Sequence, residues 1–491
     1  MRKIAKAAAA MMALAISMGS AHAVNLNPRG IGQALIFPYY TVNKGQATLL
    51  SIVNTDSVSG KGFVIHFLEG YNGQQVSGLY VFLSPNDVWT ASITQTGADG
   101  GAQIASGDHT CTSPALPSAG APFTTDAYAG NFEVGPDGGP TDVTRTREGS
   151  IEVIEIGDIP PATPLYDAIL HDQNGQPGAG VPACTAGIVD SASADLQPPS
   201  GGLFGSAAIV NVDQGVFFPY NADALSGFTD IALNVPHSTA IPFPPYLPNA
   251  NSADSSYPGG AKATLLTDDG HAIELDYENS IDAVSAVFMA DTLYNEYLAD
   301  PNLGASTDWI VTFPTKFYYV NGFTADGNAI PPFVEKFSQR AAGQSETEFA
   351  ANVYDREEGM MPPDIFPEPT SHPTFMAYQT NALTFRPPGD DSPVSSVLGS
   401  ALLQPDSQFT PLAPYGTGGW ARIGLAFGDG GAHVMRPDAG GRVLNGLPVT
   451  GFMAYNVVNA NAQPGVLANY SGAFPHRSTS TCMNPDSTLC H

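Results

Sequence analysis

Carboxylates are the first groups in this sequence whose type and spacing could do chemistry, because Ca²⁺ prefers several hard oxygen ligands. Asp268 and Asp269 are adjacent, Glu274 and Asp276 follow closely, and residues 390–391 form a second pair of aspartates. Neither group matches the twelve-residue calcium-binding loop, and turn aspartates commonly bond their own backbone. Calcium is therefore the one cofactor that the sequence leaves open, with Asp268, Asp269 and Asp276 as the candidate ligands.

Catalytic motifs of the common hydrolases and nucleotide-dependent enzymes are missing from the sequence. A nucleophilic serine usually lies on a Gly-x-Ser-x-Gly elbow, and the Gly/Ser-rich segment 202–206 does not have that pattern. The chain contains no His-Glu-x-x-His, no phosphate-binding P-loop and no Gly-x-Gly-x-x-Gly. The sequence therefore identifies no catalytic residue and favours a non-enzymatic protein.

Glycoside hydrolysis requires two carboxylates that face each other across a cleft. Glu152 and Glu155 are three residues apart in a predicted strand, 150–157, so they point to opposite faces and cannot form that pair. His66 lies between apolar neighbours in the predicted strand 62–69, with no second ligand at useful spacing. We expect His66 to be a half-buried, hydrogen-bonded side chain rather than a metal ligand.

The four cysteines predict disulfide bonds. Cys111, Cys184, Cys482 and Cys490 allow three pairings. Proximity in the sequence favours Cys482–Cys490, which leaves Cys111–Cys184; chain-entropy estimates for these loops are about 2.5 and 4 kcal/mol. The spacing matches neither a haem-attachment motif nor a zinc ribbon, so pairing in an oxidising compartment is expected.

The N-terminal residues 1–23 predict a signal peptide. A basic start is followed by an apolar run over 7–18, and Ala21 and Ala23 are small residues suited to cleavage. The apolar run is shorter than the ~20 residues of a membrane-spanning helix. We expect a mature chain that begins at Val24, has no membrane-spanning segment, and is exported to the periplasm, the cell surface or the medium.

The charge balance limits the partners of this protein. Asp and Glu number 46 against 18 Lys and Arg, which gives a net charge of −28. A chain with so few cations cannot neutralise many phosphates, so nucleic-acid binding is disfavoured. The expected partners are cell-surface or matrix components, together with other copies of the chain.

Turn residues and short apolar runs predict a mainly β fold. The chain has 52 Gly and 42 Pro, and strand-like runs recur every ~8–12 residues near the start of the mature chain. We predict two sandwich-like lobes, 24–200 and 201–491, with long Gly/Pro-rich loops. One or two helices are expected to pack on the second lobe.

The segment 280–320 carries the clearest local pattern. Apolar residues recur at helical spacing after Ser280, which predicts a helix over 280–299 with Ser280 as its N-cap. The alternating, aromatic-rich segment 307–320 predicts a strand whose Trp309 faces that helix. Because each tryptophan lies in or beside an apolar strand, Trp89, Trp309 and Trp420 are all expected in the core rather than in a sugar-stacking platform.

Three blocks of the sequence, 147–155, 308–316 and 469–477, resemble blocks in uncharacterised exported proteins of Gram-negative bacteria. That resemblance spans most of the mature chain. It implies export and a β-rich fold. Since the group has no established activity, the resemblance carries over no functional residue.

These observations predict an exported, non-enzymatic cell-envelope or cell-surface protein with a structural or adhesive role. The alternative is a secreted glycan-acting enzyme or glycan-binding module that uses acidic and aromatic residues in loops. Carboxylates facing one another in a cleft would favour the alternative, whereas a smooth body with exposed strand edges would favour assembly.

Overall fold

The structure is a computed structural model that describes residues 23–130, 137–171, 194–233, 244–250, 260–266, 270–321, 329–337, 343–359, 374–410, 416–428, 431–459, 463–466 and 468–490. Strands account for 47% and helices for 10% of it, so the predicted mainly β class is confirmed. Nearly all of the predicted signal peptide, residues 1–22, lies outside the described residues. No described helix is long and apolar enough to cross a bilayer.

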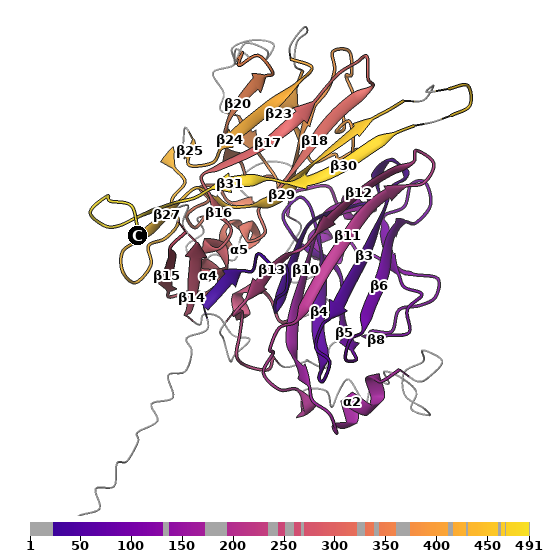
Figure 1. The fold of residues 1–491 in the computed structure, drawn as a ribbon, viewed down its shortest axis with the longest axis vertical. Helices are drawn as coiled ribbons and strands as arrows, with labels where there is room; N and C mark the ends of the chain where they lie inside the picture. Colours follow the sequence, from indigo (N-terminus) through magenta and orange to yellow (C-terminus); the bar gives the residue numbers. More distant parts are fainter. Residues whose placement is uncertain are drawn as a thin grey trace, which may run out of the picture.

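The first sandwich pairs a nine-stranded sheet with a six-stranded sheet (Figure 1). The nine-stranded sheet has the order β15 (Ala272–Tyr277), β14 (Ala261–Leu266), β1 (Ala23–Leu26), β13 (Asp223–Ser226), β2 (Ala34–Thr41), β10 (Glu148–Ile159), β4 (Gly60–Glu69), β5 (Gln75–Leu83) and β8 (Cys111–Ser113). The six-stranded sheet has the order β12 (Val216–Asn221), β11 (Leu203–Asn211), β3 (Ala47–Asn54), β6 (Val88–Gln95), β7 (Ala102–Ala105) and β9 (Ala121–Pro122).

Period-two alternation builds the core between these sheets. Phe63 and Ile65 of β4 share a buried cluster with Leu50 and Ile52 of β3 and with Trp89 of β6. Alternate residues of β3 remain partly or fully exposed, because the outer face of the six-stranded sheet meets solvent. By contrast, β4 and β10 are buried along nearly their whole length, because the nine-stranded sheet is covered on both faces.

The second sandwich pairs a five-stranded sheet with a four-stranded sheet (Figure 1). The five-stranded sheet has the order β23 (Leu403–Phe409), β22 (Thr380–Phe385), β18 (Ala305–Thr312), β29 (Thr450–Val457) and β30 (Tyr470–Pro475). The four-stranded sheet has the order β20 (Ala350–Asp355), β24 (Gly418–Gly424), β17 (Thr292–Leu298) and β31 (Arg477–Thr479). Between them, Tyr297 stacks on Phe385 with ring centroids 4.8 Å apart, and Trp309 lies 5.4 Å from the same ring.

The two sandwiches share a buried core, and the first sandwich includes strands from beyond residue 200. Strands β11, β12 and β13 fall in the second predicted lobe, yet they complete the sheets of the first sandwich by pairing with β3 and β2. The hairpin β14–β15 joins the nine-stranded sheet through β1. A buried cluster with Tyr39 and Phe218 from the first sandwich and Ile310 and Phe452 from the second lies between them. The sheets therefore do not divide at residue 200.

The helix predicted over 280–299 is wrong beyond its first two turns. The structure has α4 over Ser280–Ala286, then β16 (Met289–Ala290) and β17. Leu293, Asn295 and Tyr297 are buried alternately, which is the strand period. Backbone pairing of β17 with a strand on each side stabilises the strand more than the helical spacing of its apolar residues stabilises a helix. Ser280 is not the N-cap either, since Asn279 holds that position and no side chain caps the helix there.

Helix α4 also lies in a different place from the one predicted. It packs against β14, β15 and the 3₁₀ turn Leu247–Asn249, at the end of the nine-stranded sheet. Its Ser285 hydroxyl bonds that of Tyr319 at 2.8 Å in α5 (Lys316–Val320). The strand predicted over 307–320 is shorter in the structure. Strand β18 ends at Thr312, and the helix α5 follows at Lys316.

Short elements complete the described fold. The remaining helices are α1 (Asp126–Ala129) and α2 (Pro164–Ile169), with 3₁₀ turns at Asn43–Gly45 and Val143–Arg147. The two-stranded pairs are β16 with β28 (Leu447–Pro448), β19 (Thr347–Glu348) with β21 (Phe375–Met376), β25 (Phe427–Gly428) with β26 (Gly431–Ala432), and β27 (Val443–Asn445) with β32 (Thr481–Met483).

Candidate ligand-binding site

The outer face of the four-stranded sheet gathers aromatic and polar side chains from four strands. Because Leu293, Asn295 and Tyr297 of β17 point into the sandwich, Tyr294 and Glu296 point outward. Strand pairing sets their neighbours: Trp420 lies between Glu296 and Tyr354, and Arg422 lies between Tyr294 and Asn352. Arg477 of β31 is opposite Tyr294 on the other side. We call these seven residues, namely Tyr294, Glu296, Asn352, Tyr354, Trp420, Arg422 and Arg477, the aromatic platform.

A stacked aromatic pair forms the apolar part of the platform. The rings of Trp420 and Tyr354 are 4.4 Å apart at 13°, and Trp420 is 41% exposed. Next to Trp420, Gly419 lets the backbones of β24 and β20 lie close together, since a Cβ there would lie 1.9 Å from the Tyr354 carbonyl oxygen. A large ring left in solvent on a rigid strand is the kind of exposed apolar surface that marks a contact site.

Polar side chains flank the stacked rings, where they can form hydrogen bonds with a ligand that lies on the rings. Arg422 Nε donates to Asn352 Oδ1 at 3.0 Å, which fixes the guanidinium beside the rings. Glu296 and Arg477 form an exposed ion pair at 3.5 Å, with side chains 58% and 70% accessible. The platform can therefore offer stacking surface, guanidinium and amide donors, and carboxylate and amide acceptors to one ligand.

The platform rests on a hydrogen-bonded layer of side chains inside the sandwich. Trp309 Nε1 donates to the Glu296 carbonyl at 3.0 Å, so the buried tryptophan holds the strand that carries Glu296. Asn295 Nδ2 donates to His476 Nδ1 at 3.1 Å, and His476 Nε2 lies 3.0 Å from the Ile310 carbonyl. Only a neutral ring protonated at Nε2 satisfies both contacts. Burial lowers the pKa of His476 to about 4, opposed in part by the bond to Ile310.

The tryptophan prediction is confirmed for two residues and wrong for the third. Trp89 and Trp309 are fully buried. Trp420 is exposed, because it shares its strand face with Arg422 rather than with the buried Ala421 and Ile423. That alternation of Trp420 and Arg422 was the available signal in the sequence. The other platform residues were missed because four distant segments supply them.

Of the three calcium candidates, only Asp276 lies among the described residues. Asp268 and Asp269 lie outside the described residues. Glu274 pairs with Lys262, and no cluster that includes Asp276 has the three His, Cys, Asp or Glu groups that could hold a metal within the described parts of the chain. Asp390 accepts hydrogen bonds from Ser392 and Ser396, as a turn aspartate does.

A buried lysine and a serine meet in the first sandwich, but they do not form a catalytic dyad. Lys61 Nζ donates to Ser200 Oγ at 2.7 Å, bonds Asp158 and lies 3.3 Å from Glu155. Burial alone would lower the pKa of Lys61, but Glu155 and Asp158 raise it above its usual value. A lysine held as ammonium cannot take the serine proton. With Glu155 accepting from the Gly201 amide at 2.9 Å, the cluster fastens the 199–202 loop to β4 and β10.

Glu152 and Glu155 point to opposite faces of their strand, as the sequence predicted. Glu155 faces Lys61 on one side of β10, while Glu152 lies 3.5 Å from His66 on the other. His66 is more buried than predicted, and its ring lies against that of Tyr246 with centroids 5.2 Å apart and planes tilted by 30°. The Ser206 hydroxyl lies 3.0 Å from that of Ser51, within the regular strand β11. None of these residues has a nucleophile–base arrangement.

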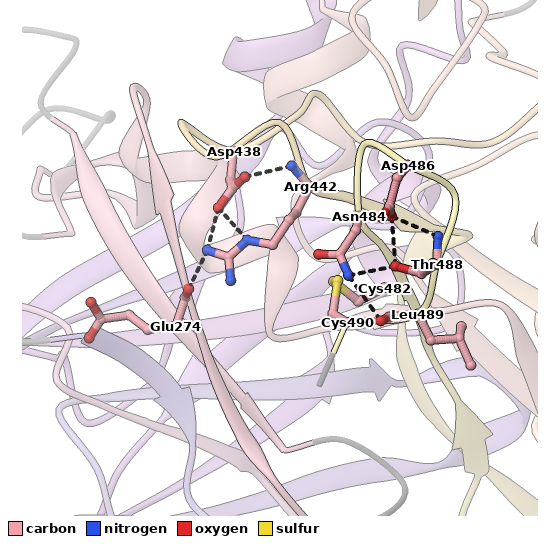
Figure 2. The surroundings of a disulfide bond; sticks show 9 residues. All are labelled: Glu274, Asp438, Arg442, Cys482, Asn484, Asp486, Thr488, Leu489 and Cys490. Atoms are coloured by element: carbon pink, nitrogen blue, oxygen red, sulfur yellow. Dashed lines mark hydrogen bonds and ion pairs between the residues drawn. A yellow bond between two sulfur atoms is a disulfide. The ribbon is translucent and has the colours of Figure 1, made fainter.

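The C-terminal disulfide is confirmed. Cys482, in β32, bonds Cys490 across a Cα–Cα distance of 5.3 Å (Figure 2). Asn484 donates to Thr488 Oγ1 and to the Leu489 carbonyl inside the loop so closed (Figure 2). Cys111 is also disulfide-bonded, whereas its predicted partner Cys184 lies outside the described residues.

Comparison with known proteins adds no relative to this picture. No protein-family model, no curated protein and no solved structure matches the chain. The resemblance to exported proteins of Gram-negative bacteria stays a prediction, and any functional assignment depends on the aromatic platform itself.

Proposed function

We propose that this is an exported, non-enzymatic protein of the cell envelope or cell surface with an adhesive role, and that it adheres by binding glycans on the aromatic platform. The observation that carries the proposal is the solvent-exposed stack of Trp420 on Tyr354. A pyranose ring presents a face of C–H groups, which packs well on the electron-rich face of an indole or phenol ring.

Residue types and geometry both support binding as the role of this face. Trp, Tyr and Arg supply most of the binding energy at recognition surfaces, and all three occur on the platform. Sugar hydroxyls are both donors and acceptors, and the platform pairs them with Arg422, Asn352 and Glu296. Because β-strands hold these side chains, little conformational freedom is lost when a ligand binds.

The charge of the platform favours an uncharged glycan. Glu296 and Arg477 neutralise each other, so Arg422 alone leaves the face slightly positive. The chain as a whole has a net charge of −28, which repels polyanions at long range. We therefore expect binding of neutral polysaccharide with little dependence on salt.

Glycan hydrolysis receives less support from the platform. Both hydrolytic mechanisms need two carboxyl groups about 5–10 Å apart on either side of the bond to be cleaved. Among the described outward positions of these four strands, Glu296 is the only carboxylate, and Arg477 holds it in an ion pair.

A binding assay with point variants tests the proposal. The mature chain is applied to immobilised neutral and acidic polysaccharides, and binding is measured for wild type, Trp420→Ala and Tyr354→Ala. Each substitution should weaken binding to neutral polysaccharide about 5- to 30-fold, because one stacked ring is worth roughly 1–2 kcal/mol.

The matched control is Tyr470→Ala, which removes a ring that is 60% exposed on β30, in the other sheet of the second sandwich. It should leave binding unchanged. Equal binding by wild type and Trp420→Ala, or no binding of any polysaccharide by a folded wild type, would overturn the proposal.

A further inference from the structure

Lys61 is fully buried in the first sandwich, next to two carboxylates of the neighbouring strand. It lies directly opposite Asp158 where β4 pairs with β10, and its Nζ donates to Asp158 Oδ1. The same Nζ lies 3.3 Å from Oε1 of Glu155, whose side chain is also fully buried. An amine is thus held in contact with two carboxyl groups and away from bulk water, where ionic groups are costly to keep.

A β-bulge in β10 places both carboxylates on the same side of the strand as Lys61. Residues three apart in a regular strand face opposite sides of the sheet, yet Glu155 and Asp158 both contact Nζ. Between Glu155 and Gly157 the strand β10 advances by two residues while β4 advances by one. Such bulges are common beside functional sites, where they change the direction of a side chain. The strand therefore departs from its regular course where the two carboxyl groups meet the lysine.

We propose that Lys61 and Asp158 become joined by an amide bond, with Glu155 as the group that transfers the protons. Nζ forms a bond to Cγ of Asp158, and the bond from Cγ to one carboxyl oxygen breaks. Of the three protons on the ammonium, the amide keeps one and two leave with that oxygen as water. Atoms and charges balance between one ammonium and one carboxylate, so the reaction needs no oxidant and no further reactant.

Glu155 is oriented to receive a proton from Lys61. Its Oε2 accepts from the Gly201 amide at 2.9 Å, and Oε1 faces Nζ with no hydrogen-bond partner of its own among the described residues. Burial raises the pKa of Glu155 well above its ordinary value, although the charge of Lys61 opposes the rise. The ammonium is the resting form of Lys61, but its proton passes to Glu155 more easily than to an ordinary carboxylate. That transfer frees the lone pair of Nζ for attack on Cγ.

Ser200 holds the two reacting groups together. Its amide donates to Asp158 Oδ1 at 3.1 Å, and its hydroxyl accepts from Lys61 Nζ at 2.7 Å. The amide can stabilise the negative charge that develops on Oδ1 when Cγ becomes tetrahedral. The Asp158 side chain is 14% accessible, so the released water has a way out to solvent. Fixed proximity of this kind accelerates a reaction by several orders of magnitude.

The amide joins residues that are 97 positions apart in the chain. It connects β4 to β10, which are neighbours inside the nine-stranded sheet. A link across so long a loop restricts the unfolded chain and prevents these two strands from separating. The cross-link forms within one chain and needs no ligand, so it does not depend on glycan binding by the aromatic platform.

The intact mass of the mature chain, measured after its disulfides are reduced, tests the cross-link. Wild type should be one water lighter than its sequence requires. A protease digest should contain the peptide of Lys61 joined to the peptide of Asp158. Asp158→Ala and Glu155→Gln should each have the full sequence mass, because the first removes the group that is attacked and the second cannot transfer the proton.

Asp56→Asn is the matched control. It removes another carboxylate near Lys61, at 3.6 Å, but leaves the reacting groups in place, so it should remain one water lighter. Thermal unfolding shows whether each variant is folded, and the wild-type mass is decisive without any variant. A wild type of full sequence mass, or a missing water that maps to other residues, would overturn the cross-link. Equal cross-linking in Glu155→Gln and wild type would overturn the role of Glu155.

Discussion

At the scale of residues, the side chains beneath the aromatic platform matter as much as those on it. Trp309 and His476 lie in contact, with ring centroids 5.0 Å apart, between the two sheets of the second sandwich. Trp309 bonds β17 and His476 bonds both β17 and β18. Together they tie the sheet that carries the platform to the sheet behind it.

Trp309→Ala should destabilise the protein by ~3–5 kcal/mol, because it leaves a large cavity and an unpaired Glu296 carbonyl. Chemical unfolding of the variant beside wild type measures this loss. Trp420→Ala is the control, since a ring that is 41% exposed contributes less to folding and should cost under about 1 kcal/mol. Equal losses for the two variants would contradict the assignment of one ring to the core and the other to the surface.

His476 should make stability fall as the solution becomes acidic. Its pKa is about 4 in the folded protein against 6.5 without the fold, so the unfolded chain takes up a proton first as pH drops. Stability is therefore unaffected above pH 6.5 and is lost between pH 6.5 and 4. Because a part of the His476 side chain remains accessible to solvent, we expect a loss of about 1–3 kcal/mol.

Urea unfolding at pH 7 and pH 4 measures this loss. His476→Gln keeps a donor and an acceptor without titrating, so the variant should lose less stability than wild type over that interval. His109→Gln, at an exposed loop position, should behave as wild type does. A variant His476→Gln with the same pH dependence as wild type would contradict the prediction.

At the scale of elements, the segment after Ser280 shows how tertiary context decides between helix and strand. Its apolar residues satisfy helical spacing, and the first seven residues do form α4. The next residues pair with β24 and β31 on either side, and these backbone bonds make β17 a central strand. These partner strands, Gly418–Gly424 and Arg477–Thr479, lie far away in the chain. Local periodicity does not reveal them, so it does not show that the helix ends at Ala286.

Strand alternation was the more reliable signal at this scale. In β4, alternate residues do lie on opposite faces, with Phe63, Ile65 and Phe67 between the two sheets of the first sandwich and Val64 on the other side. For β24, the same rule applied to Trp420 and Arg422 would have predicted the exposed tryptophan. Trp420 was expected in the core because its neighbours in sequence are apolar, but those neighbours lie on the opposite face of the strand.

At the scale of the molecule, the two sandwiches are joined by a shared core and by hydrogen bonds between them. The hairpin β14–β15 extends the nine-stranded sheet, and side chains cross the contact: Thr312 Oγ1 donates to the Pro38 carbonyl at 2.7 Å, and Glu148 accepts from the Ala401 amide at 2.8 Å. Phe452 stacks on Tyr220 across the same contact, with centroids 4.8 Å apart.

The two sandwiches should therefore unfold in a single transition. Hydrogen exchange at increasing urea should give the same opening free energy for peptides from β4 and from β18. Phe452→Ala should lower both values together by ~3 kcal/mol, because Phe452 is buried in the shared core. Phe474→Ala, which removes a half-exposed ring, is the control; a loss confined to β18 would mean that the sandwiches unfold separately.

The sequence by itself determined the properties that depend on composition and local alternation. These include the mainly β class, the C-terminal disulfide between Cys482 and Cys490, the burial of Trp89 and Trp309, and the separation of Glu152 from Glu155. Each follows from side-chain period or from proximity along the chain, which a single segment specifies.

Only the tertiary structure decided the features that depend on partners distant in sequence. Tyr354, Trp420, Glu296 and Arg477 meet because strands from four segments pair in one sheet. Strand order and register are set by the free energy of the whole set of pairings and cores. No local pattern contains that information, so only the fold shows the aromatic platform.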